Sequence, residues 1–161
     1  MGAGGVGGLM VKRNGPQPPR QIPTADDWRG YETDLDVRDA HRMMFGKTND
    51  QIQSLFHSGR SISRASELLF MPRKAFQYDV FGFAQYLMTD AARGESDSES
   101  PFLHLLVNRE KRDPTSVLHI YGALEPDIEC VASRQDCFDG SPHIYGKFRD
   151  LQQNLASLCG R

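Results

Sequence analysis

The residues with the widest chemical repertoire in this 161-residue chain are its five histidines. They are His41, His57, His104, His119 and His143. No two of them are four residues apart, which is the spacing that places two imidazoles on one face of a helix, and no H-E-x-x-H motif occurs. The sequence therefore predicts no metal site and no cofactor.

One stretch gathers several carboxylates next to an imidazole. Asp34, Asp36 and Asp39 precede His41 and could together surround a metal ion. On a helix each residue turns by about 100°, so Asp34 and Asp36 point about 200° apart and cannot face the same ion. We expect an acid-rich helix start here, with Asp39 and His41 kept as candidates for a hydrolase-like pocket.

Nucleophilic catalysis has no clear sequence signature. The three cysteines, Cys130, Cys137 and Cys159, are odd in number and lack C-x-x-C spacing, so they indicate neither a disulfide framework nor a zinc ribbon. No G-x-S-x-G elbow occurs, and Gly46-Lys47-Thr48 is only the tail of a phosphate-binding loop. We therefore predict no catalytic residue and expect the cysteines to be buried and inert.

The charge distribution is uneven along the chain. The formal net charge is −2, yet residues 1–24 carry Lys12, Arg13 and Arg20 without any acid. The remaining residues are mildly acidic, which argues against a broad nucleic-acid surface. The cluster at residues 109–112 (Arg-Glu-Lys-Arg) falls at an expected helix end, where cations suit the helix dipole. Weak nucleic-acid binding through these basic residues is our second alternative.

Composition divides the chain into two parts. Residues 1–24 are rich in glycine and proline, which predicts a disordered tail, either native or derived from a vector with Met10 as the true start. Residues 25–161 are expected to form a single helical domain. No apolar run is long enough to span a bilayer, and no secretory signal is evident, so we expect a cytoplasmic protein.

The stretch from Leu68 to Met88 holds six of the fifteen aromatic residues. Phe76, Val80, Phe83 and Leu87 follow Pro72 at steps of four, three and four, which places them on one face of a helix. Tyr78, Phe81 and Tyr86 flank that seam and are our candidate partner-binding surface. The spacing predicts a central aromatic helix over about residues 72–90, around which the other helices pack.

Caps and prolines locate the remaining helices. A helix is expected to begin at Thr33 or Asp34, with Asp34 and Asp36 favouring its first turn, and to end at Gly46. Thr48 or Asn49 can cap a shorter helix that Gly59 ends. A short helix or turn is expected over residues 61–71, with a break before Pro72.

Three further helices are predicted from a capping residue followed by proline. The pairs are Ser100-Pro101, Asp113-Pro114 and Ser141-Pro142. Pro126 should kink or split the segment that follows the second pair. Since no stretch alternates apolar and polar residues for long, we predict an all-α fold of about six or seven mostly antiparallel helices.

The chain also resembles a group of small uncharacterised helical proteins of bacteria. The residues that carry the resemblance are Phe45-Gly46-Lys47, Leu69-Phe70-Met71-Pro72, Phe76, Tyr78, Phe83, Tyr86-Leu87, Phe138-Asp139 and Ile144-Tyr145-Gly146-Lys147-Phe148. They cover about residues 33–158. The resemblance implies a bacterial cytoplasmic protein and carries over no catalytic residue.

These observations favour a protein that acts by binding another protein, as an accessory or immunity-type factor, over an enzyme. The acidic loop with Glu95, Asp97 and Glu99 could meet a basic partner. The alternative is a hydrolase-like enzyme or small-ligand binder with a pocket between helices, using Asp39, His41 or a later histidine. The sequence indicates neither the partner's identity nor an oligomeric state.

Overall fold

The computed structural model describes residues 15–57, 59–92, 95–135 and 146–161. These residues form six α-helices and five short 3-10 helices, and none of them lies in a strand. The predicted all-α fold is therefore confirmed. None of the helices in these ranges is long and apolar enough to cross a membrane.

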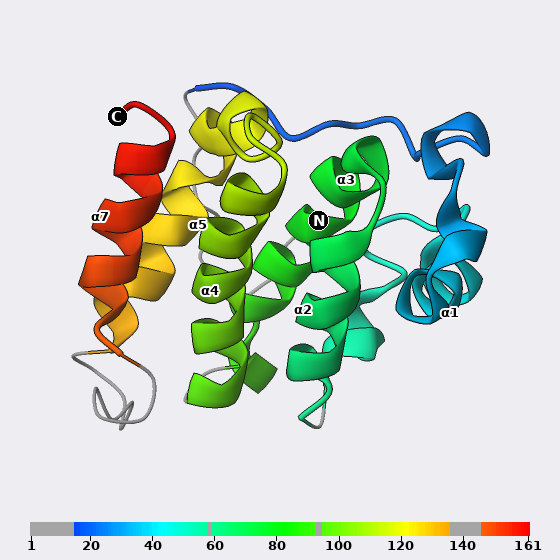
Figure 1. Cartoon of the computed structure of the whole chain (residues 1–161). Coiled ribbons are helices and arrows are strands. Elements are labelled where there is room, and N and C mark those ends of the chain that lie inside the picture. Colours follow the sequence, from blue (N-terminus) through cyan, green and yellow to red (C-terminus); the bar gives the residue numbers. More distant parts are fainter. Residues whose placement is uncertain (1–14, 58, 93–94, 136–145) are drawn as a thin grey trace, which may run out of the picture.

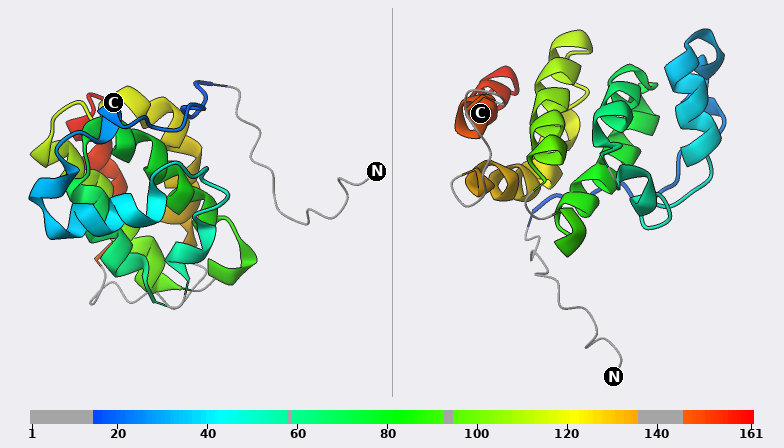
Figure 2. Two further views of the ribbon diagram at one scale, coloured as in Figure 1. Left: turned by 90° about the vertical axis from the view of Figure 1, so that its right-hand side faces the viewer. Right: turned by 90° about the horizontal axis from the view of Figure 1, so that it is seen from below.

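The helices lie in two layers (Figures 1 and 2). The first layer contains α1, α2, α4 and α7, each packed against the next. The second contains α3 and α5, which contact each other behind the first layer. The helix bounds are α1 Leu35–Met44, α2 Ser61–Phe70, α3 Arg73–Leu87, α4 Ser96–Arg112, α5 Tyr121–Arg134 and α7 Phe148–Leu158.

The 3-10 helices are single turns that join or support the longer elements. They are η2 Asp26–Trp28, η3 Tyr31–Thr33, η4 Gln53–Phe56, η5 Asp90–Ala92 and η6 Leu118–Ile120. Both η2 and η4 pack against α3.

Helix α3 is the centre of the fold, as its sequence predicts. All four residues of its apolar seam are 0% exposed, and the helix contacts α2, α4 and α5 as well as three of the short helices. Pro72 caps the helix instead of occupying its first position, and Met71 is extended, as a residue before proline must be. Phe83 stacks on Phe56 at 4.8 Å and meets Phe102 edge-on at 5.3 Å.

The start and end of α1 also agree with the prediction. The Asp34 carboxylate accepts hydrogen bonds from the N–H groups of Asp36 (2.8 Å) and Val37 (3.2 Å), so it caps the helix. Gly46, just beyond the helix, has a φ of +76°, a conformation that glycine adopts without strain.

The proline-based helix starts are partly wrong. Helix α4 begins at Ser96 and carries Pro101 inside it, because residues before the proline are drawn into the core: Ser98 and Glu99 are each 1% exposed. The Ser98 hydroxyl lies 2.8 Å from that of Ser61 in α2. Tertiary contacts thus extend the helix upstream of the proline.

The Asp113-Pro114 pair opens a turn and not a helix. The carboxylate of Glu110 accepts hydrogen bonds from the N–H groups of Thr115, Val117 and Leu118, which holds the turn together. Helix α5 then starts at Tyr121 and runs without a break through Pro126, against the predicted split.

The start predicted for the last helix lies in part outside the described residues. Ser141 and Pro142 fall in that part of the chain, and the helix that contains Phe148 begins at Phe148 itself. The predicted helix would have included residues 146 and 147, which are not helical.

Residues 15–24 form an extended segment along the body, which we call the strap (Figure 1, dark blue). Pro23 is buried, and a β-carbon at Gly122 of α5 would lie only 3.0 Å from Cγ of Pro16. The predicted tail covered residues 1–24, of which residues 1–14 lie outside the described ranges. Within residues 15–24, Pro23 is buried, and Pro18 and Ile22 are half-buried.

Gly82→Ala tests how closely α3 approaches the loop before η4. An added β-carbon would lie 2.6 Å from Cδ1 of Ile52 and 2.8 Å from Oδ1 of Asn49. Alanine favours a helix by about 1 kcal/mol relative to glycine. We nevertheless expect the free energy of unfolding in urea to fall by about 1–3 kcal/mol, since overpacking displaces the neighbours.

Ile52→Val is the matched second change, because it removes the methyl group nearest to the added carbon. The double variant should lose less stability than the two single variants do together. Strictly additive losses would contradict the close approach of Gly82 and Ile52.

Candidate functional site

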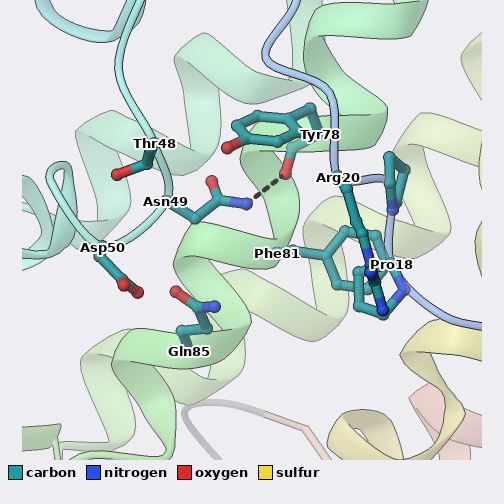
Figure 3. A pocket seen from close by; sticks show the side chains of 9 residues that line it. Pro18, Arg20, Thr48, Asn49, Asp50, Tyr78, Phe81 and Gln85 are labelled. Carbon is teal, nitrogen blue, oxygen red and sulfur yellow. Dashed lines mark hydrogen bonds between the residues drawn. The ribbon is translucent and has the colours of Figure 1, made fainter.

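A hollow lies beside the central helix where the strap crosses it. Its volume is about 340 Å³, and we call it the strap hollow. It is lined by strap residues 18–20, by loop residues 48–50, and by Tyr78, Phe81 and Gln85 of α3. Pro18 and Arg20 enter from one side, and Thr48, Asn49 and Asp50 face them from the other (Figure 3). The hollow therefore has an aromatic floor, with polar groups along the opposite rim.

Side-chain amides join the loop to α3 at this rim. Asn49 is 8% exposed, and its Nδ2 donates to the carbonyl of Tyr78 at 3.0 Å (Figure 3). Nε2 of Gln53 donates to the carbonyls of Asn49 (2.9 Å) and Gly82 (3.0 Å), and to Oε1 of Gln85 (3.1 Å). The loop is thus anchored along one side of α3. Oδ1 of Asn49 has no hydrogen-bond partner among the described residues.

The strap is anchored at its C-terminal end by a reciprocal pair. The N–H of Thr24 donates to Oδ2 of Asp27 at 2.8 Å, and the N–H of Asp27 donates to Oγ1 of Thr24 at 3.3 Å. Trp28, in the short helix that follows, is 1% exposed. Residues 16–20, in contrast, lie on the body mainly through proline rings. The strap is therefore fixed more firmly near Thr24 than near Pro16.

The three aromatic residues predicted to face a partner are all buried. Tyr78 is 6% exposed, Phe81 is 2% exposed and Tyr86 is 0% exposed. Tyr78 and Phe81 lie under the strap, whereas Tyr86 packs against Phe56 and donates from its hydroxyl to Glu95 at 2.9 Å. The three side chains do not form one exposed patch, and their binding of a partner stays a prediction.

The histidines are held apart in the described structure. His41 stacks on Tyr31 at 3.7 Å and on Phe45 at 4.7 Å, and burial lowers the pKa of its imidazole. His57 meets the ring of Tyr86, while His104 and His119 are exposed on different helices. His143 lies outside the described residues. No group of three or more metal-ligating side chains is found among the described residues.

The acidic run beside His41 is divided among separate roles. Asp34 caps α1, and Asp39 is exposed and pairs with Arg42 at 3.3 Å. The hydrolase-like combination of Asp39 with His41 is therefore not assembled in a cleft, because His41 is enclosed by aromatic rings.

Cys159, at the end of α7, shows no sign of activation. Cys159 is 4% exposed, and burial raises the pKa of its thiol to about 11, so it remains protonated at neutral pH. Cys130 is half-buried, and Cys137 lies outside the described residues.

The basic cluster at the end of α4 stabilises helix ends. Arg109 is 4% exposed, and its Nη1 donates to the carbonyls of Leu69 (2.8 Å) and Met71 (2.7 Å) at the end of α2. Arg112 lies over the ring of Phe70 at 4.5 Å. An ion pair joins Asp113 to Arg73 at 2.5 Å. The arginines therefore serve the junction of α2, α3 and α4.

Sequence reasoning missed the buried acids. Asp79 is 1% exposed on α3, and neither of its carboxylate oxygens has a hydrogen-bond partner among the described residues. Burial raises the pKa of Asp79 well above its ordinary value. Burial also raises the pKa of Glu67 to about 7, although Arg64 lies 2.8 Å away. The spacing of Asp79 from Phe76 and Phe83 places it on the buried face of the helix. This spacing could have identified Asp79 as buried from the sequence.

No protein-family model, no curated protein and no solved structure matches this chain. The resemblance to small helical bacterial proteins therefore stays a prediction.

Asp79→Asn removes the buried ionisable group while nearly preserving its shape. The folded protein retains a proton on Asp79 that the unfolded chain loses above a pKa of about 3.9. The stability that this proton provides is complete below that pH and declines as the pH rises toward the folded-state pKa. Above about pH 4, we expect the wild type to lose stability relative to the variant as the pH rises. The difference between their unfolding free energies should change by up to about 1.4 kcal/mol per pH unit.

Urea denaturation of both proteins at a series of pH values measures this difference in unfolding free energy. Asp150→Asn, which removes an exposed carboxylate, is the control for the loss of one negative charge. Parallel stability profiles for the wild type and Asp79→Asn would show that Asp79 is not buried as described.

Proposed function

We propose that this protein acts by binding another protein, as an accessory factor in the bacterial cytoplasm, and that the partner lies where the strap crosses α3. One observation carries the proposal: an extended polypeptide segment, the strap, is already seated there. A surface that accommodates an extended segment of its own chain has the shape and chemistry to accommodate one from a partner.

The lining of the strap hollow supports a polypeptide ligand. Tyr78 and Phe81 provide apolar area, and aromatic side chains are enriched in protein interfaces. The exposed side chain of Gln85 offers an amide group that can donate to, or accept from, a peptide backbone. Asp50 adds a negative charge at the rim, which suits a partner with a basic residue.

The enzymatic alternative is less well supported. It requires a base, a nucleophile or a metal ion held beside a cavity. His41 is stacked between aromatic rings, and Asp39 is paired with Arg42 on the surface. The strap hollow itself contains one carboxylate, from Asp50, and no histidine or cysteine.

Nucleic-acid binding has less support than the enzymatic alternative. Lys12 and Arg13 lie outside the described residues. Of the other basic residues in that hypothesis, Arg20 lines the strap hollow, while Arg109 is committed to backbone carbonyls. These two arginines serve different parts of the fold.

A photo-crosslinking amino acid in place of Gln85, an exposed residue of α3 at the rim, tests the proposal in the intact chain. Expressed in the source cells and irradiated, this protein should give one discrete crosslinked species. The same substitution at exposed Ser157 of α7, on the opposite side of the fold, is the control.

Crosslinks that form equally from Gln85 and Ser157 would contradict the proposal. So would the absence of any crosslink from Gln85 and from a second rim position, Thr48, in proteins whose circular dichroism shows them to be folded.

A further inference from the structure

We infer that the partner segment is proline-rich and extended, and that the strap is an internal copy of this ligand which competes with it. This inference rests on the proposed function and names the chemistry of the partner. The strap has four prolines within eight residues: Pro16, Pro18, Pro19 and Pro23. Such sequences favour the polyproline II conformation, which has no internal hydrogen bonds and exposes its backbone carbonyls.

Two of these prolines lie beside aromatic rings of α3, which are surfaces that proline rings prefer. Pro18 and Pro19 line the hollow together with the rings of Tyr78 and Phe81. Aromatic grooves that bind preformed polyproline II segments are a recurrent mode of peptide recognition, because little conformational entropy is lost on binding. The aromatic floor therefore favours a proline-rich ligand over a flexible one.

Pro16 lies close to a glycine of α5. Because a β-carbon at Gly122 would lie 3.0 Å from Cγ and 3.5 Å from Cδ of Pro16, the strap passes close to the backbone of α5 at this point. Gly122 lies inside the helix, where alanine would be favoured on propensity alone. The absence of a side chain is thus matched to the passage of the proline ring.

The strap fills its groove only in part. Besides the hollow of about 340 Å³, a second hollow of about 210 Å³ shares Pro19 and Tyr78 with it and is bordered by Lys74 and Gln77. Both are open beside a segment that is fixed mainly at Thr24. A partner segment with larger side chains between its prolines could fill this space and so displace the strap.

Tethering gives the strap an advantage in this competition. A segment joined to its own site by a short linker acts at an effective concentration on the order of millimolar. An external peptide should therefore bind weakly to the wild type and more tightly once the strap is loosened.

The experiment measures binding of a fluorescent peptide that copies residues 15–24 to full-length protein. The comparison is between the wild type and the variant Pro18→Gly/Pro19→Gly, in which the strap loses its stiffness at two points while the residues of the groove are unchanged. We expect the peptide to bind the variant at least about tenfold more tightly than the wild type, a difference of about 1.4 kcal/mol.

Two controls separate this result from general loosening of the fold. A peptide in which all four prolines are alanine should not bind either protein. Trypsin should cleave after Arg20 faster in the variant, while its thermal midpoint stays close to that of the wild type. If the double variant does not fold, Pro19→Gly alone is compared with the wild type in the same way.

Equal affinity of the peptide for wild type and variant, or equal binding of the alanine peptide, would overturn the inference. A concentration-dependent dimer that dissociates on Pro18→Gly/Pro19→Gly would assign the groove to a second copy of the chain and would also overturn it. A crosslinked partner at Gln85 without binding of the proline peptide would leave the proposed function standing and remove only this inference.

Discussion

The burial of α3 is the constraint on which the rest of the structure depends. A helix with apolar residues on most of its circumference is stable only if other elements cover it on nearly every side. Eleven of its fifteen residues are buried, including Phe76, Val80 and Phe83. The two layers, the single-turn helices η2 and η4 and the strap are all arranged to provide that cover.

Enclosing α3 forces polar groups into the interior, and several of them form hydrogen bonds with backbone groups. Arg109 donates to carbonyls at the end of α2, and Glu110 accepts from the N–H groups of the turn before η6. Each charge therefore stabilises the end of an element that the core needs in place. Asp79 is different, because it is buried without a hydrogen-bond partner among the described residues, and burial raises the pKa of its carboxyl group well above the ordinary value.

The strap links the covering of α3 to the proposed function. The side of α3 that carries Tyr78 and Phe81 is bordered by the strap, an extended segment, and by the loop of residues 48–50. An extended segment buries less surface than a helix would, and open space remains beside it. Of all the cover on α3, the strap is the part that another polypeptide could replace at the lowest cost in core packing.

The sequence by itself determined the helical class, the central position of α3, the approximate start of α1 and the end of α1 at Gly46. These features depend on periodicity and local hydrogen bonding, which a short stretch of chain contains in full. It did not determine the start of α4 or the continuity of α5 through Pro126, because contacts with distant residues outweighed the local preference of proline. The burial of Tyr78, Phe81 and Tyr86 was likewise decided only by the tertiary structure. Whether an aromatic side chain beside a helical seam faces solvent depends on what crosses it, and here the strap, some sixty residues away in the sequence, lies over Tyr78 and Phe81.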